Sequence, residues 1–376
     1  MFDNIEDLKS HLTVSQTLKA LVVKKQELSS IRTKYSSIML KEKSITPIRD
    51  HPSYTDSKIM LLKPDADLSI IDAGMTTIDY TVTLGYQSLS WNEALHHALP
   101  EEVETPSSFE TIGHIAHFNL NEDQMKFKKL IGEVILDKLP AITTVVAKTG
   151  NIENTFRVLP MEIIAGEDNF ETTLKEEGCF YNLDFSKVYW NSRLSREHSR
   201  VANLVSGTVA DVFAGIGPFV VPAAKREAIS KVFANDLNPE SFKYLQKNIS
   251  LNKVEDKIQT FNLDGREFIR KVVQDGNKID NFIMNLPALA PEFCDAFIDL
   301  FDDVESLPTV FIYSFAPKED PEQFTKDRLS GILGVKCEGK VDLVRLVAPN
   351  KWMVCHEIKL PAELVKNEDA SKKKLN

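Results

Sequence analysis

Apolar positions in the first part of the chain follow no single period for long. The opening 60 residues combine amphipathic helical patterns with short apolar pieces, which are interrupted by Pro47, Pro52 and Pro64. We therefore predict a small N-terminal domain over residues 1–77.

Strand-like alternation and helical periodicity then follow each other up to about residue 194. The pattern predicts a helix over 122–139 and strands at 78–84, 158–165 and 179–185. This mixture indicates an α+β middle domain over 78–194.

From residue 195 the order becomes strand, turn, helix, repeated. The expected strands lie at 209–213, 231–235, 258–261, 279–284 and 309–313, and the expected helices at 218–229 and 239–251. Such alternation is typical of an α/β fold with a doubly wound, mainly parallel Rossmann-like sheet that helices cover on both faces. We place this domain at 195–365 and expect a flexible polar tail at 366–376.

Composition excludes several classes of protein. The chain has 376 residues, of which 43% are hydrophobic and 27% charged, so it is neither a disulfide-knot peptide nor fibrous nor largely disordered. No apolar stretch approaches the roughly 18 residues of a membrane span, and the acidic N-terminus differs from a secretory signal. The four cysteines lack Cys-x-x-Cys or metal-ligand spacing, so we expect reduced thiols inside the cell.

The net charge of −10 argues against nonspecific nucleic-acid binding, but the distribution is uneven. Residues 19–49 hold eight basic residues against Glu27 and Glu42, and a second basic cluster surrounds Glu197. An RNA partner therefore stays open. The alternative is that these clusters are solvated helix faces.

Two glycines follow the first strand of the expected sheet. Gly215 and Gly217 stand in Asp211-Val-Phe-Ala-Gly-Ile-Gly217, where glycine lets the backbone pass close to a ligand. The third glycine of a dinucleotide fingerprint is absent, and no Gly-Lys-Ser/Thr follows that would bind phosphates.

Polar side chains follow each of the next three strands. Asp236 ends the second strand, where a carboxylate can accept both ribose hydroxyls; Asp264 suits an adenine amino group, and Asn285 ends the fourth strand. The alternative for each carboxylate alone is a helix N-cap. The ordered series predicts an S-adenosylmethionine-dependent methyltransferase, whose nucleoside cofactor has no phosphate.

Several motifs flank this series. They are Val188-Tyr-Trp-Asn-Ser-Arg-Leu194, Glu197-His-Ser-Arg200, Asn235-Asp-Leu-Asn-Pro239 and Asn285-Leu-Pro-Ala288, with upstream segments 111–120, 131–138 and 156–166. Together they resemble the archaeal and eukaryotic tRNA (guanine-37-N1)-methyltransferases, from about residue 88 to about 315. The resemblance implies a small domain that touches the tRNA body, a middle domain and a methyltransferase domain, with the target base flipped out.

The resemblance also implies roles for individual residues. Those matching cofactor contacts are His198, Asp236, Leu237, Asp264, Gly265 and Asn285, to which the glycine loop adds Asp211, Gly215 and Gly217. Glu197 matches the proposed general base and Arg157 the proposed catalytic arginine. This agrees with the chemistry: a carboxylate takes the N1 proton, a guanidinium stabilises charge on O6, and Asn285 binds an exocyclic amine. The alternatives are that Glu197 pairs with Arg193 and that Arg157 is a surface residue.

Other residues favour simpler roles. His114 and His117 face opposite sides of an extended strand, so a shared metal ion is awkward and packing or tRNA positioning is preferred. Tyr189 and Trp190 either stack on a base or fill a domain junction. We expect no metal, because the sulfonium is already activated.

The predicted function is therefore methyl transfer to N1 of guanine 37 in tRNA. The rivals are the aminocarboxypropyl transferase of wybutosine synthesis, on the same fold, and a non-catalytic tRNA-binding protein. Implied with the function are S-adenosylmethionine as cofactor, tRNA with guanine at position 37 as partner, and a monomer without membrane contact. The expected location is the cytoplasm, with the mitochondrial matrix and the nucleus left open.

Overall fold

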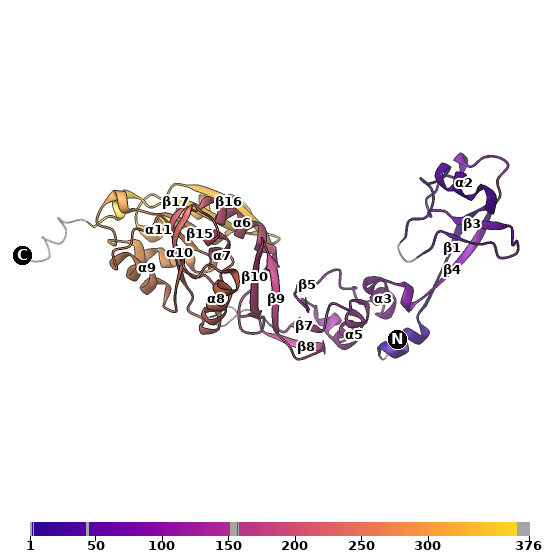
Figure 1. Cartoon of the computed structure of the whole chain (residues 1–376), viewed down its shortest axis with the longest axis horizontal. Coiled ribbons are helices and arrows are strands. Elements are labelled where there is room, and N and C mark those ends of the chain that lie inside the picture. Colours follow the sequence, from indigo (N-terminus) through magenta and orange to yellow (C-terminus); the bar gives the residue numbers. More distant parts are fainter. Residues whose placement is uncertain (1, 3, 43–44, 151–155, 157, 367–376) are drawn as a thin grey trace, which may run out of the picture. The chain divides into compact units, whose positions relative to one another are not determined.

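The computed structural model describes residues 2, 4–42, 45–150, 156 and 158–366. The chain forms two compact units: unit 1 contains Met1–Lys148 and Glu162–Asp168, and unit 2 contains Thr149–Met161 and Asn169–Asn376. Figure 1 labels many of their helices and strands. Within the described ranges no helix is long and apolar enough to cross a membrane.

The first sheet of unit 1 is antiparallel, in the order β2-β3-β1-β4. Its strands are β1 (Thr13–Lys24), β2 (Ile48–Asp50), β3 (Ser57–Leu61) and β4 (Thr77–Gly85), accompanied by α1 (Ile5–His11), η1 (Lys25–Glu27), α2 (Leu28–Lys34), η2 (Leu68–Ile70) and η3 (Tyr86–Ser88). The expected strand at 78–84 is thus found. It pairs with β1 over its whole length, so this sheet extends past residue 77.

The second sheet of unit 1 has the order β5-β6-β7-β8. Its strands are β5 (Glu110–Ile112), β6 (Ile115–Phe118), β7 (Thr144–Lys148) and β8 (Met161–Gly166), accompanied by α3 (Trp91–Ala98), α4 (Glu122–Met125) and α5 (Lys128–Lys138). The single helix expected at 122–139 is therefore two, because Phe127 leaves helical backbone (φ −110°, ψ 13°). Buried residues of both sheets and of α5, such as Ile59, Val134 and Val145, form one core.

Unit 2 contains the predicted doubly wound sheet, in the order β13-β12-β11-β14-β15-β17-β16. Its strands are β11 (Gly207–Asp211), β12 (Ile229–Asn235), β13 (Ile258–Phe261), β14 (Asn281–Met284), β15 (Thr309–Pro317), β16 (Lys340–Ala348) and β17 (Lys351–Lys359). The pairs from β13 to β15 are parallel, as predicted. The pairs β15–β17 and β16–β17 are antiparallel, an addition that the sequence pattern did not predict.

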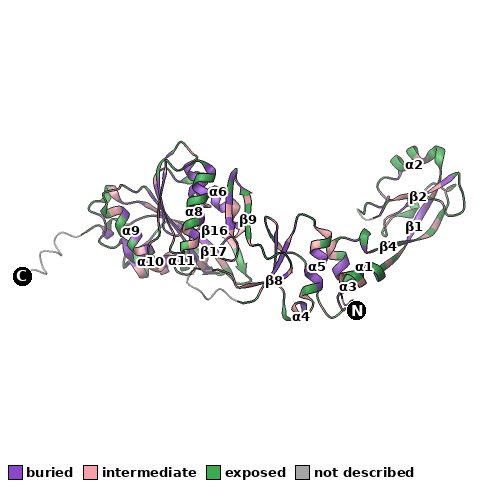
Figure 2. Cartoon of the chain, turned by 60° about the horizontal axis from the view of Figure 1, so that its bottom comes forward, coloured by how far each residue is buried: buried purple, intermediate pink, exposed green. Residues whose placement is uncertain are grey.

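Along the chain, helices precede, connect and follow these strands. They are α6 (Ser195–Leu204), α7 (Val220–Ala224), α8 (Pro239–Asn252), α9 (Gly265–Gln274), α10 (Ala290–Phe293) and α11 (Pro321–Leu333), with η4 (Ser192–Leu194), η5 (Cys294–Phe297), η6 (Val304–Ser306) and η7 (Ala362–Leu364). The helix expected at 218–229 shortens to α7, which contains Pro222, a residue that lacks a backbone N–H. Every residue of β14 is buried, as in a sheet covered on both faces. In Figure 2, α8 by contrast carries both buried and exposed residues along its length.

A hairpin of β9 (Glu171–Glu176) and β10 (Cys179–Asp184) packs on α8 through two asparagines. The Asn248 side chain accepts from the N–H of Asn182 (2.7 Å) and donates to its carbonyl (3.1 Å). Asn252 does the same with Phe180 (2.9 and 2.6 Å). Two side chains one helical turn apart, Asn248 and Asn252, thus hydrogen-bond to the backbone of alternate residues at the edge of β10. A neighbouring strand would satisfy the same backbone groups.

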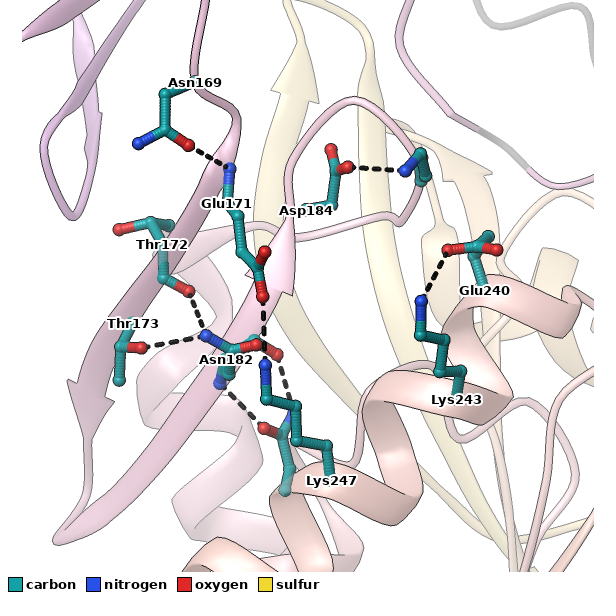
Figure 3. Close-up of polar contacts among 11 residues, drawn as sticks. Asn169, Glu171, Thr172, Thr173, Asn182, Asp184, Glu240, Lys243 and Lys247 are labelled. Atoms are coloured by element: carbon teal, nitrogen blue, oxygen red, sulfur yellow. Dashed lines mark hydrogen bonds and ion pairs between the residues drawn. The ribbon is translucent and has the colours of Figure 1, made fainter.

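Figure 3 shows this contact, with an ion pair between Lys247 of α8 and Glu171 of β9 (3.0 Å) beside it. The hairpin therefore belongs to unit 2, whereas the sequence pattern places it in the middle domain that ends at residue 194.

Candidate active site

The loop after β11 turns tightly against the end of β12. Gly215 (φ +56°) and Gly217 (φ +100°) adopt the left-handed backbone that favours glycine. A Cβ on Gly217 would lie 2.9 Å from a methyl group of Val221, so the loop also packs closely on α7. The N–H of Gly215 donates to Asp236 Oδ2 (2.8 Å), which ties the loop to the next strand.

A pocket of about 320 Å³ opens where the parallel strands end. Six predicted residues line it: Gly215, Asp236, Leu237, Asp264, Gly265 and Asn285. Much of the remaining wall is apolar, from Leu194, Phe213, Leu263, Leu286, Phe293 and Phe315. Pockets at the carboxyl ends of parallel strands are the usual ligand sites of open α/β sheets.

Asp236 faces the pocket and also fixes its floor. Its Oδ1 accepts from the N–H of Asn238 (2.9 Å), and burial raises the pKa of this carboxyl to about 6. The N-cap of α8 is Asn238, whose side chain accepts from Glu240 N–H (3.0 Å). The helix-cap alternative for Asp236 is therefore wrong.

For Asp264 the helix-cap alternative is confirmed, and its contact with an adenine amine stays a prediction. Its Oδ1 caps α9 by accepting from Arg266 N–H (2.9 Å), and the residue lines the pocket. A Cβ on neighbouring Gly265 would lie 2.9 Å from the ring of Phe293 and 3.0 Å from that of Phe213. Only glycine keeps this wall open between two rings that meet edge to face.

Asn285 presents an acceptor that has no donor. Its Oδ1 is buried without a hydrogen-bond partner within the described residues. The loop that carries it is fixed to β15, because Phe315 N–H donates to the carbonyl of Pro287 (3.2 Å). A buried acceptor left unpaired favours a ligand that brings an N–H or O–H donor.

Three predicted cofactor residues are not among the pocket-lining residues: His198, Asp211 and Gly217. His198 Nδ1 lies 2.7 Å from Glu176 Oε1 in a buried pair that joins α6 to the hairpin. Asp211 is fully buried; one oxygen accepts from Phe213 N–H (3.2 Å), the other has no partner within the described chain, and burial raises its pKa.

Glu197 also lies outside the pocket lining and is buried on α6. Its carboxylate accepts two hydrogen bonds from Arg200 (2.6 and 2.7 Å) and one from the hydroxyl of Tyr313 (2.7 Å). Arg200 donates further to Asp342 of β16 (2.9 Å). The ion pair is thus with Arg200, three residues on, and the expected alternative partner Arg193 is wrong.

The remaining candidates divide. Arg157 lies outside the described residues. Trp190 is 4% exposed and packs on Tyr181 within unit 2, with ring centroids 5.3 Å apart, while its place at a domain junction stays a prediction. Tyr189 is 41% exposed and lines the pocket, so its stacking on a base stays a prediction. No group of three possible metal ligands occurs among the residues that the structure describes.

Sequence reasoning missed one wall of the pocket. Phe315 lines it from the end of β15, and Arg345, Val347 and Met353 line it from the antiparallel hairpin of β16 and β17. The one available signal is the arginine inside the apolar run Leu343-Val-Arg-Leu-Val347.

Two family profiles match parts of the chain. A profile described as the TRM5/TYW2 methyltransferase domain matches residues 172–323, and one described as the TYW2 N-terminal domain matches 91–169.

Individual proteins match over longer stretches. A Danio rerio tRNA (guanine(37)-N(1))-methyltransferase is 47% identical over 75% of the chain, which spans 62% of that relative's length. A Xenopus tropicalis protein of the same name is 40% identical over 91% of the chain and 76% of its own length. The crystal structure of Trm5b from Pyrococcus abyssi, 28% identical, superposes with a TM-score of 0.70 over 91% of this chain and 99% of that one.

Proposed function

The chain belongs to the tRNA (guanine-37-N1)-methyltransferase family, and on this premise we propose that it transfers the methyl group of S-adenosylmethionine to N1 of guanine 37 in tRNA. One observation carries the proposal. Gly215, Asp236, Asp264 and Asn285, which follow four successive strands along the chain, line a single pocket.

The pocket residues suit the cofactor. Asp236 offers a carboxylate for two ribose hydroxyls, Asp264 an acceptor for an adenine amine, and Gly265 a gap between two rings. When bound, S-adenosylmethionine supplies a methyl group that its sulfonium has already activated. The residues of this chain then have to hold and orient both partners and accept one proton.

Asn285 orients the guanine in this proposal. Its unpaired Oδ1 accepts from the exocyclic amine of the base, and Pro287 and Phe315 offer apolar surfaces for a flat ring. The base thus supplies the donor that Asn285 Oδ1 lacks. The free-energy penalty of burying this oxygen unpaired is therefore offset when substrate binds.

Glu197 is the proposed general base, which takes the N1 proton. A carboxylate has about four acceptor sites, and Arg200 with Tyr313 occupies three of them, so one site remains for the N1–H. The role requires Glu197 to reach the base when tRNA is bound. Arg157 is proposed to stabilise the charge that develops on O6.

We propose further that unit 1 contacts the tRNA body through its basic residues and that the protein acts as a monomer. Lys24, Lys25 and Arg32 are exposed at the end of β1 and on the helices after it, where phosphates can reach them. The proposed location is the cytoplasm, with the mitochondrial matrix and the nucleus as further sites; fractionation of cells that express tagged protein tests this.

The decisive experiment combines methyl-labelled S-adenosylmethionine with a tRNA transcript that has guanine at position 37, followed by mapping of the modified nucleotide. Label at N1 of guanine 37 supports the proposal, and a transcript with adenine there is the control. Aminocarboxypropyl transfer would leave the label on the by-product. Tight tRNA binding with no turnover would support a non-catalytic protein.

A further inference from the structure

One arginine of the pocket has no acidic partner. Arg345 of β16 lines the pocket, and its guanidinium has neither an ion-pair partner nor a hydrogen-bond acceptor within residues 158–366. Four other arginines of unit 2 donate to carboxylates or carbonyls: Arg200, Arg226, Arg266 and Arg328. The nearby Asp342 is already engaged by Arg200 and by Lys340.

The sheet register connects this guanidinium to the base-binding side of the pocket. Arg345 stands opposite Met353 of β17, and Met353 stands opposite Phe315 of β15. All three line the pocket, so they form one row on one face of the sheet. Neighbouring strands are about 4.8 Å apart, so the row extends roughly 10 Å. Its inner end is fixed beside Asn285 by the hydrogen bond from Phe315 to Pro287.

Backbone irregularities flank the arginine. The β16–β17 register shifts between Leu343 and Arg345 and again between Leu346 and Ala348. Such irregularities change the direction in which a side chain points, and they are frequent beside binding sites. Arg345 therefore lies in a segment whose pairing departs from a regular ladder on both sides.

Charge separates the two ends of the pocket. Asp236 and Asp264 line the cofactor side, where a phosphate would meet like charge, while Arg345 lies at the sheet edge. Between them Phe315 and Met353 offer apolar contact. An apolar face followed by a guanidinium matches a nucleotide, which has a flat base at one end and an anionic phosphate at the other.

We propose that Arg345 binds a backbone phosphate of the nucleotide whose base enters the pocket, and so positions that base against Asn285. The proposal rests on the proposed function, since it takes tRNA as the substrate. A guanidinium presents a planar fork of donors that fits a phosphate with two hydrogen bonds, which a lysine does not reproduce.

The test uses Arg345→Ala and Arg345→Lys in the full chain, with Arg270→Ala as matched control. Arg270 is an exposed arginine of α9 that does not line the pocket, so its removal changes net charge equally. The dissociation constant for an unmodified tRNA transcript is measured at several salt concentrations. The single-turnover rate of methylation is measured at saturating substrate. Two further tRNAs each contain one neutral methylphosphonate, at the phosphate 5′ of nucleotide 37 in the first and 3′ of it in the second.

We expect Arg345→Ala to weaken tRNA binding about 10-fold to 100-fold and to lower the salt slope by about one, with cofactor affinity unchanged. Arg345→Lys should recover part of the lost affinity. Arg270→Ala should weaken tRNA binding less than about twofold. One methylphosphonate should weaken wild-type binding similarly and leave the Arg345→Ala complex unaffected, because the contact is already absent.

Three results would overturn the phosphate contact. They are additive losses from Arg345→Ala with both methylphosphonates, equality of Arg345→Ala with Arg270→Ala, and a slower methylation step with normal tRNA affinity and salt slope. The last would place the guanidinium on the base. Failure of the proposed function gives a different result, namely no methylation of guanine 37 by the wild-type protein.

Discussion

At the scale of single residues, the protonation of Asp236 should control cofactor affinity. Burial raises the pKa of this carboxyl to about 6, and only the ionised form accepts both ribose hydroxyls. We expect the Kd for S-adenosylhomocysteine to rise as pH falls through about 6, approaching tenfold per pH unit below it. Calorimetric titration between about pH 5 and 8 measures this.

The matched variant is Asp236→Asn, which should bind the cofactor about 10-fold to 100-fold more weakly and without this pH dependence. The contribution of Asp236 to the stability of the unliganded protein changes with pH in the opposite direction to cofactor affinity. A raised folded-state pKa favours the protonated form, so the contribution of Asp236 is present near pH 4 and is lost as pH rises through about 6. A pH-independent Kd in the wild type would remove Asp236 from the ribose site.

Glu197 gives the sharpest test of mechanism. Glu197→Gln keeps the size of the side chain but removes the base, so the single-turnover rate should fall about 10²-fold to 10⁴-fold. Cofactor and tRNA affinity should change only a few fold. If more than about a tenth of the rate remains, Glu197 is a structural partner of Arg200 and not the base.

Sequence reasoning succeeded where strand order alone brings residues together. Asp236, Asp264 and Asn285 each follow a parallel strand, and such strand ends meet at one edge of the sheet. The partners of Glu197 could not be predicted in this way, because Tyr313 lies 116 residues downstream and donates from an antiparallel-paired strand. Nothing local in the sequence indicates that pairing.

At the scale of elements, boundaries were predictable where a local cap defines them. Asn238 followed by Pro239 starts α8 as expected. The hairpin of β16 and β17 was missed because Leu343 and Leu346 are exposed apolar residues, which break the alternation that indicates a half-buried strand. That omission also hid Arg345.

The contact between α8 and the hairpin should contribute measurably to stability. Asn248→Ala leaves two backbone groups of Asn182 without partners, so we expect a loss of about 1–3 kcal/mol, and a similar loss for Asn252→Ala. Denaturant unfolding measures it. Asn203→Ala, which removes one exposed helix-surface hydrogen bond, is the control and should cost less than about 0.5 kcal/mol. Equal losses from Asn248→Ala, Asn252→Ala and Asn203→Ala would mean that the contact between α8 and the hairpin adds no specific stability.

At the scale of the whole molecule, we expect unit 1 to contribute to tRNA binding through charge attraction between its basic residues and phosphates of the tRNA body. Replacing Lys24, Lys25 and Arg32 with alanine should weaken binding of full-length tRNA and flatten its salt dependence, because fewer counterions are released. The isolated anticodon stem-loop should bind as before. Filter binding at several salt concentrations measures both, and an unaltered slope would mean that these residues are only a solvated face.

The chain leaves unit 1 at residue 148 and returns for Glu162–Asp168 before it leaves again. During synthesis, β7 therefore emerges from the ribosome before the strand that covers its edge. At about 5–20 residues per second, the next 20 residues take roughly 1–4 s. For that interval the nascent protein exposes an open strand edge, which is where chaperones and neighbouring nascent chains would bind.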